Sequence, residues 1–261
     1  MKIKDIIAHL ESVAPLPYQE DYDNSGLISG NMDWDCTGIL LSLDCTEAIL
    51  KEAVEKKCNL IVSHHPLIFR PIRQISFENS IGRALSFSIA KEIAIYAMHT
   101  NLDNIPSGVN AVIADKLKLV NRQILSPHKE FPNTGSGLIG DLMKPVSEME
   151  FLGLLKEKFM TSVIRHSPLK GRPVKRVGIC GGSGSFLIIN ALQKGADFFI
   201  TADVKYHDFF NAEGKLVIAD IGHFESEQFT VDLLHEEILK KFPNFAVLKS
   251  DTVTNPVNYY I

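Results

Sequence analysis

Cysteine is scarce in this sequence, and no two cysteines lie close together. The four cysteines of the 261-residue chain occur without a C-x-x-C pair, at Cys36, Cys45, Cys58 and Cys180. Disulfide frameworks of small secreted domains and structural zinc ribbons both depend on closely spaced cysteines, so the pattern argues against both kinds of protein. Scattered thiols of this kind are typical of reducing compartments, and we expect the chain to be cytoplasmic.

Long apolar runs and a secretion signal are also lacking. No run approaches the roughly 20 apolar residues that cross a membrane as a helix. The N-terminal stretch MKIKDIIAHLESVAP has acidic residues inside its apolar part and no small-residue cleavage site. It therefore predicts an amphipathic helix rather than a signal peptide, and we expect no membrane partner.

Positive charge is not in excess. Lysine and arginine number 27 against 31 aspartate and glutamate residues, which gives a net charge of -4 and a pI near 6.1. Sequence-independent binding to nucleic acid depends mostly on a basic excess. The overall charge therefore does not indicate nucleic acid as a partner. The net charge does not exclude a local basic patch.

The sequence does contain the composition of a globular protein, with short β-rich runs that alternate with longer helical patterns. Hydrophobic residues make up 45% of the chain and charged residues 22%. The alternation predicts an α/β fold. The predicted strands are 38–44, 59–63, 93–98, 176–180, 197–201 and 215–220. Helices are predicted at the N-terminus, at 46–57, 81–91 and 107–117, before Lys194 and from about Phe224.

One segment has the composition of a boundary between domains. Residues 126–136, SPHKEFPNTGS, are dense in proline, glycine, serine and asparagine. We interpret them as the junction of two lobes, 1–127 and 128–261, and leave open an exchange of terminal segments between the lobes.

Two stretches of the chain share one layout. EAVEKKCNLIVSHH (Glu52–His65) and NALQKGADFFITAD (Asn190–Asp203) each combine a helix end, a small or turn residue and an apolar strand. Both then lead to another apolar strand that ends in His-x-x-x-acid. Such spacing also recurs by chance, so an ancient duplication and a coincidence both remain compatible with it. A duplication would place two polar strand ends across a pseudo-twofold axis.

Two adjacent histidines follow the predicted strand 59–63. His64 and His65 precede Pro66, which cannot continue a ladder and turns the chain. Consecutive side chains on extended backbone point to opposite sides, so the two imidazoles reach two neighbouring ions more readily than a single ion. Taken alone, a hydrogen-bonded pair of turn histidines is the more common situation.

Two carboxylates also follow predicted strands. His223 and Glu227 lie four apart at the start of a predicted helix, which puts their Cβ atoms roughly 5–6 Å apart on one face. Asp103 follows strand 93–98 in the segment MHTNLDN, and a carboxylate can bridge two cations. Taken alone, the first pair suits a solvated helix face and the aspartate suits a backbone cap.

Together these residues predict one metal site. Carboxyl ends of strands in open α/β sheets meet at a crevice, so side chains from different strands converge there. The candidate ligands are His64, His65, Asp103, His223 and Glu227. Mixed imidazole and carboxylate ligation with few ligands per ion leaves positions for water, which is the catalytic pattern. We predict two divalent ions per chain, with zinc, iron, manganese and magnesium left open.

Three further features give weaker signals. His99 fits a ligand, a partner of a ligand or a proton carrier equally well. Asp203, Lys205 and His207 follow a strand at the position equivalent to the double histidine, where they can contact a ligand or substrate or simply begin a polar helix. GGSG at 181–184 can cradle a phosphate at a helix N-terminus, but it lacks the GxxxxGK[ST] spacing, so a tight turn is favoured.

Several motifs resemble those of one known family. SHHPLIF, HTNLD, TADVKYHD and GHFESE, with YDNSGL and GGSG, resemble the GTP cyclohydrolase I type 2 homologues, also called the NGG-interacting-factor-like family. The resemblance covers essentially the whole chain, and the double-histidine and GH-x-x-S-E motifs are specific. Ala202 stands where the family form T-G-D-V-K-Y-H has glycine, which is a mild departure.

This resemblance implies two α/β lobes with a dinuclear metal site in the cleft between them. It also implies that the five candidate ligands are the family's ligands, and that the chain assembles into a toroidal homohexamer. The chain passes from the region of residue 130 straight into its second lobe, so it resembles the short form without the inserted middle domain.

The functional prediction is a metal-dependent hydrolase that acts on a small, nucleotide-like substrate. Two bridged cations would lower the pKa of a shared water toward neutrality, and His99 or His207 would move the proton. The name GTP cyclohydrolase carries over only as a family label, because nothing in the sequence reads out guanine. The alternative is a metal-binding protein without turnover that acts in metal delivery or as an assembly scaffold.

Overall fold

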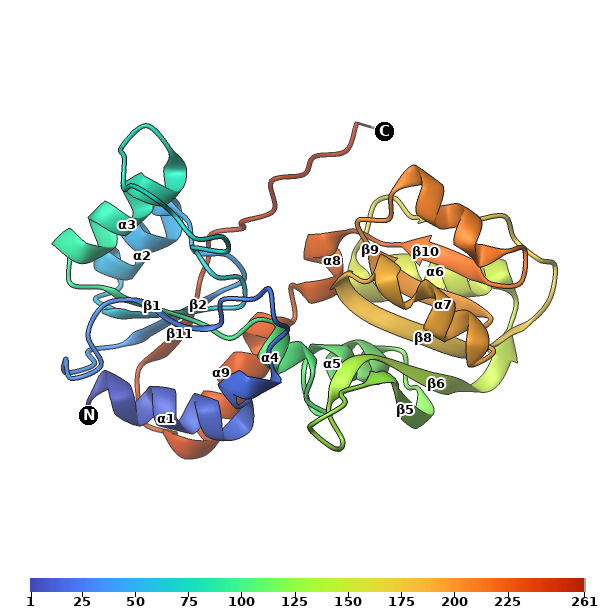
Figure 1. Cartoon of the computed structure of the whole chain (residues 1–261), viewed down its shortest axis with the longest axis horizontal. Helices are drawn as coiled ribbons and strands as arrows, with labels where there is room; N and C mark the ends of the chain where they lie inside the picture. Colours follow the sequence, from blue (N-terminus) through green and yellow to red (C-terminus); the bar gives the residue numbers. More distant parts are fainter. Residues whose placement is uncertain (261) are drawn as a thin grey trace. The chain divides into compact units, whose positions relative to one another are not determined.

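The chain forms two compact units in the computed structural model, which describes residues 1–260. Unit 1 contains Met1–Leu102 and Thr230–Pro256, whereas unit 2 contains Asp103–Phe229 and the chain from Val257 on. Each unit is a β-sheet with helices packed against it (Figure 1), which confirms the predicted α/β class. Among the described residues, no helix is both long enough and apolar enough to span a membrane.

Unit 1 is built on a five-stranded sheet with the order β1-β4-β3-β2-β11. Its strands are β1 (Gly26–Ser29), β2 (Ile39–Ser42), β3 (Leu60–Ser63), β4 (Ala94–Ala97) and β11 (Val247–Lys249). All run parallel except β1, an antiparallel edge strand. Every residue of β2, β3 and β4 is buried, because helices cover both faces of the sheet, and this explains their nearly continuous apolar sequences.

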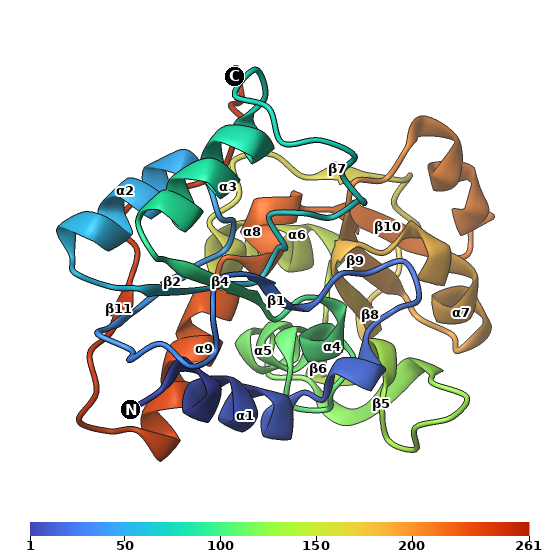
Figure 2. The ribbon, with the colours of Figure 1, turned by 60° about the vertical axis from the view of Figure 1, so that its left-hand side comes forward.

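Two pairs of helices cover this sheet. They are α1 (Ile3–Val13) with α9 (Thr230–Lys241), and α2 (Glu47–Glu55) with α3 (Ser80–Ala90). The pair α2 and α3 lies on one face and the pair α1 and α9 on the other (Figures 1 and 2). The helix predicted after Thr46 is confirmed, because the Thr46 hydroxyl caps α2 by accepting a hydrogen bond from the Ile49 N–H.

Unit 2 holds a six-stranded sheet with the order β5-β6-β8-β9-β10-β7. Its strands are β5 (Val120–Pro127), β6 (Gly135–Val146), β7 (Arg165–His166), β8 (Val174–Ser183), β9 (Phe198–Ala202) and β10 (Val217–Asp220). The strands β8, β9 and β10 are parallel, and the other pairings are antiparallel.

Helices pack on both faces of this second sheet as well. They are α5 (Val109–Lys116), α6 (Glu148–Phe159), α7 (Ile188–Gln193), α8 (His223–Glu227) and the 3-10 helices η2 (Ser185–Leu187) and η3 (Tyr206–Ala212). Alternation along β9 separates the two faces. Phe199 joins a core cluster with Ile188 of α7, whereas the Phe198 ring lies 5.0 Å from that of Phe151 on α6.

The segment 126–136 connects β5 to β6, which pair as antiparallel neighbours inside unit 2. Its proline and glycine residues therefore mark a hairpin connection, whereas the chain first changes unit after Leu102. Turn composition shows where a strand ends but does not distinguish a hairpin from a junction between units.

The two units repeat one topology. In unit 1, the parallel strands β2, β3 and β4 alternate with α2 and α3, and the short helix α4 (Thr100–Asp103) follows β4. In unit 2, the parallel strands β8, β9 and β10 alternate with α7 and η3, and α8 follows β10. This repetition favours duplication over a chance likeness of the two stretches. A His-x-x-x-acid motif follows the third parallel strand of each set, although Asp103, the acid of the first motif, already belongs to unit 2.

Glu52 fastens the C-terminal part of unit 1 to α2. Its buried carboxylate accepts hydrogen bonds from the Ser250 hydroxyl (2.6 Å), the Asp251 N–H (2.8 Å) and the Thr252 N–H (3.3 Å). It also pairs with Lys56 at 2.7 Å. Burial raises the pKa of Glu52, but these bonds outweigh burial and lower the pKa from its ordinary 4.5 to about 2.

Replacing Glu52 with alanine should lower the free energy of unfolding of unit 1 by about 2 kcal/mol, because three donors lose a charged acceptor. Since the folded-state pKa is depressed, this contribution is fully present above pH 4.5 and is lost as the pH falls toward about 2. Urea unfolding at neutral pH and near pH 2 measures both effects. The control Glu55→Ala, on the exposed side of α2, should change the free energy by less than about 0.5 kcal/mol. Equal losses for both variants at neutral pH would contradict this account.

Candidate metal centre

Three histidines come together in unit 1. His64 and His65 directly follow β3, and their N–H groups continue its pairing with β2 by donating to the carbonyl oxygens of Ser42 (3.3 Å) and Leu43 (2.9 Å). His99 follows the neighbouring strand β4. The three ring centroids lie 5.0 to 5.4 Å apart, and one ring nitrogen of each lies within 4.8 Å of the others. Two adjacent parallel strands therefore deliver their histidines to one place.

The double histidine is oriented by oxygen partners. His64 Nδ1 lies 2.8 Å from the carbonyl oxygen of Met98, and His65 Nδ1 lies 2.7 Å from Asp44 Oδ1. An acceptor at this position favours the tautomer with the proton on Nδ1, so Nε2 becomes the basic nitrogen that can bind a metal ion.

Asp23 orients His99 in the same way. His99 Nδ1 lies 2.6 Å from Asp23 Oδ1, while the other carboxylate oxygen accepts from the hydroxyls of Thr100 (2.5 Å) and Ser25 (2.9 Å). Burial raises the pKa of Asp23, but its bonds with His99 and Thr100 hold that pKa well below its usual range. Sequence reasoning missed this role of Asp23, because a turn aspartate far from His99 in the chain carries no sign of its partner.

His223 and Glu227 form the corresponding group in unit 2. Both lie on α8, and the helical spacing places His223 Nε2 3.1 Å from Glu227 Oε2. The other ring nitrogen, Nδ1, lies 2.7 Å from Asp203 Oδ2. Burial lowers the pKa of His223, but the two carboxylates outweigh burial and raise the pKa to about 11. These carboxylates attract positive charge to the ring, so a proton and a metal cation compete for this position.

Asp203 and His207 turn out to differ in their surroundings. Asp203 reaches His223 from the end of β9 with a left-handed backbone, φ 54°, which aspartate tolerates better than most residues. His207 is exposed on η3, and its ring packs near Tyr206 (5.1 Å) and Phe210 (6.3 Å). Among the described residues, His207 belongs to no cluster of metal-ligating side chains.

Asp103 is tied to the end of β8. Its carbonyl oxygen accepts a hydrogen bond from Asn110 Nδ2 at 3.2 Å, and Asn110 Oδ1 accepts one from the Gly181 N–H at 3.0 Å. Glu227 packs at the same place, since a Cβ atom on Gly181 would lie 3.5 Å from Glu227 Cγ. Both predicted carboxylate ligands therefore lie beside one strand end within unit 2.

The backbone N–H groups of the GGSG motif take part in this packing. Gly181–Ser183 closes β8 and Gly184 precedes η2, so the predicted tight turn is wrong in detail. The N–H groups of Gly181, Gly182 and Gly184 donate to side chains of Asn110, Ser226 and Thr201 respectively. At Gly182, with φ +60°, a Cβ atom would lie 2.3 Å from Glu227 Oε1. Glycine here makes room for the Glu227 carboxylate.

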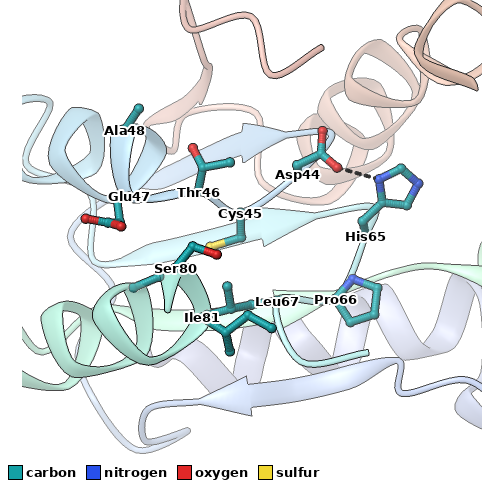
Figure 3. Close-up of a pocket in the computed structure, with 11 residues that line it drawn as sticks. Asp44, Cys45, Thr46, Glu47, Ala48, His65, Pro66, Leu67, Ser80 and Ile81 are labelled. Atoms are coloured by element: carbon teal, nitrogen blue, oxygen red, sulfur yellow. Dashed lines mark hydrogen bonds and ion pairs between the residues drawn. The ribbon is translucent and has the colours of Figure 1, made fainter. Parts of the chain in front are cut away.

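A recess in unit 1 opens beside His65 and Asp44 (Figure 3). Its volume is about 420 Å³, which is within the range of small-molecule sites. The walls come from the first residues of α2 and α3 and from the chain after the double histidine. Cys45, Leu67 and Ile81 give it a largely apolar lining.

The donor atoms in each unit suit a divalent metal ion. Imidazole nitrogen together with carboxylate oxygen is a ligand set for zinc, iron or manganese. The histidines in both units also have the oxygen partner on the second ring nitrogen that metal-binding histidines usually have. Unit 1 therefore brings three imidazole donors together, and unit 2 places an imidazole beside a carboxylate, which are donor types for a divalent cation.

Known proteins resemble this chain along its length. The sequence model of Duf34/NIF3 (NGG1p interacting factor 3) matches residues 1–256. A Clostridium perfringens protein named GTP cyclohydrolase 1 type 2 homolog is 36% identical over 228 residues, 87% of each chain. A Campylobacter jejuni protein of the same name is 33% identical over the full length of both chains. A solved structure of a Staphylococcus aureus hypothetical protein has a TM-score of 0.91 at 30% identity, covering 100% of this chain and 99% of that chain.

Replacing Gly182 with alanine should weaken Zn²⁺ binding by about 10-fold or more, because the new Cβ atom displaces the Glu227 carboxylate. Competition with a chromophoric chelator measures the affinity. Gly214→Ala is a matched control, since Gly214 has φ +61° and open space around its Cβ position. It should cost similar backbone strain, about 1 kcal/mol, and leave the affinity unchanged. Equal Zn²⁺ affinities in the two variants would rule out this role for Gly182.

Proposed function

This chain belongs to the Duf34/NIF3 (NGG1p interacting factor 3) family, and on that premise we propose that it binds two divalent metal ions at one site and uses them to hydrolyse a small substrate. The observation that carries the proposal is the shared orientation of the histidines. In each, Nδ1 lies 2.6 to 2.8 Å from an oxygen, the usual arrangement around metal ions, and four residues have it: His64, His65, His99 and His223.

The proposed centre draws its ligands from both units. They are His64, His65, Asp103, His223 and Glu227. Asp103 is the first residue of unit 2 after Leu102, and Glu227 lies two residues before Phe229, after which the chain returns to unit 1. Such a small ligand set leaves positions for water and substrate around two ions.

Bound divalent ions supply Lewis-acid activation of water and of the substrate's electrophilic atom. The chain's own contribution is to hold the ligands and to move a proton. Asp23 favours the tautomer with the proton on His99 Nδ1, which leaves Nε2 as the basic nitrogen, and one ring nitrogen of His99 lies within 4.8 Å of ring nitrogens of His64 and His65. In that position, His99 accepts a proton from the attacking water and returns it to the leaving group.

The recess beside His65 supports a small substrate. Its lining is largely apolar, and its two carboxylates already have partners: Glu47 pairs with Arg83 at 2.7 Å, and Asp44 bonds to His65 and Thr254. The recess therefore suits a small, mostly uncharged part of a substrate. The curated relatives are named GTP cyclohydrolase 1 type 2 homolog, and we extend from that name only a nucleotide-like substrate.

The proposal also covers the oligomeric state of the chain and its compartment in the cell. The family resemblance supports a toroidal homohexamer, in which a repeated contact closes into a ring. The four cysteines are buried free thiols, which suits the cytoplasm.

To test the proposal, the metal-loaded protein is incubated with a panel of nucleotides and free bases, and hydrolysis is measured by chromatography. We expect turnover of at least one member, and we expect Glu227→Ala to abolish it. His99→Asn should lower kcat by about 10²-fold or more while the metal content is retained, because it removes a proton carrier. His207→Asn should keep the rate. A loss confined to His207→Asn would move the proton-transfer role to that residue.

Two outcomes would contradict hydrolysis. A folded, metal-loaded chain that turns over no member of the panel but passes its ions to an acceptor protein would favour metal delivery. A chain that does neither and whose assembly depends on bound metal would favour a scaffold.

A further inference from the structure

The C-terminal segment of unit 1 is held at defined points although it forms no helix or strand between Ser250 and Pro256. The Ser250 N–H extends the pairing of β11 with β2 by donating to the carbonyl oxygen of Leu41 at 2.9 Å. The Glu52 carboxylate then holds the next residues through the bonds described above. The segment is therefore docked on unit 1 before it leaves at Pro256.

Thr254 also docks on unit 1, by bonding to Asp44, and Asp44 orients the proposed metal ligand His65. Its hydroxyl donates to Asp44 Oδ2 at 2.5 Å, and Asp44 Oδ1 lies 2.7 Å from His65 Nδ1. One carboxylate thus connects a hydroxyl near the C-terminus with an imidazole at the end of β3. All three residues belong to unit 1.

The hydroxyl of Thr254 restricts the rotation of the Asp44 carboxylate. The terminal torsion of aspartate has broad energy wells, so a single hydrogen bond leaves the carboxylate room to turn. The bond from Thr254 to the other oxygen adds a restraint on this carboxylate, and a fixed carboxylate in turn fixes the imidazole plane and its tautomer. Asp23 is pinned comparably by Ser25 and Thr100 before it bonds to His99.

We propose that Thr254 is a positioning residue of the metal centre, which acts on His65 through Asp44 and makes metal affinity depend on docking of the C-terminal segment. This inference rests on the proposed function, because it requires His65 to bind a metal ion. Since coupling between two equilibria is reciprocal, bound metal also stabilises the docked segment.

Zn²⁺ affinity of the full chain, measured by chelator competition, tests the inference. Thr254→Val keeps the shape of the side chain but removes the hydroxyl, and it should weaken Zn²⁺ binding by about 10-fold. Thr254→Ser retains a hydroxyl and should bind within about twofold of the wild type. Val253→Ala, at an exposed neighbour, is the control and should bind like the wild type.

A double-mutant cycle separates action through His65 from general loosening of the segment. In a His65→Ala background, Thr254→Val should weaken the remaining Zn²⁺ binding by less than about twofold. Equal losses in both backgrounds would overturn the inference, as would Thr254→Ser binding as weakly as Thr254→Val. If the wild type binds Zn²⁺ and Thr254→Val binds it equally well, only this inference fails. If the wild type binds no Zn²⁺, the proposed function fails together with it.

Discussion

A hydrogen bond between an imidazole Nδ1 and an oxygen is the interaction on which the chemistry of both units depends. Neutral imidazole has one donor nitrogen and one acceptor nitrogen, so a proton held on Nδ1 makes Nε2 the acceptor. The fold supplies the oxygen differently each time. A carbonyl group just after β4 serves His64, and the carboxylates of Asp44, Asp23 and Asp203 serve the other three histidines. Without these oxygens, the same histidines would populate both tautomers and several ring orientations.

Parallel strands make this arrangement possible. Strands that run in the same direction end at the same edge of a sheet, so residues far apart in the sequence meet there. Unit 1 uses the ends of β2, β3 and β4 to place Asp44, the double histidine and His99. Unit 2 uses the ends of β8, β9 and β10 to place Gly182, Asp203 and α8. The repeated topology therefore explains why each unit contributes imidazole and carboxylate groups after equivalent strands.

The sequence could predict those parts of the site that depend on residues close together in the chain. The double histidine and the His-x-x-x-acid motif are visible because each follows an apolar run directly, and helical spacing alone brings His223 to Glu227. Asp203 was among the candidates, but the sequence did not indicate Asp44 and Asp23, because they meet their histidines through strand pairing rather than through nearby sequence. The prediction of a tight turn at the GGSG motif was wrong in detail for another reason. Glycine permits a turn, a phosphate cradle or a close approach of another side chain, and only the position of Glu227 distinguishes them.

The central claim is the proposal that His64 and His65 of unit 1 hold one pair of ions together with three ligands of unit 2, Asp103, His223 and Glu227. Anomalous diffraction at the zinc edge from crystals of the Zn²⁺-loaded protein tests this claim most directly. We expect two peaks about 3.5–4 Å apart, with His64, His65, Asp103, His223 and Glu227 as ligands. A single peak, or two peaks bound separately within unit 1 and within unit 2, would contradict it.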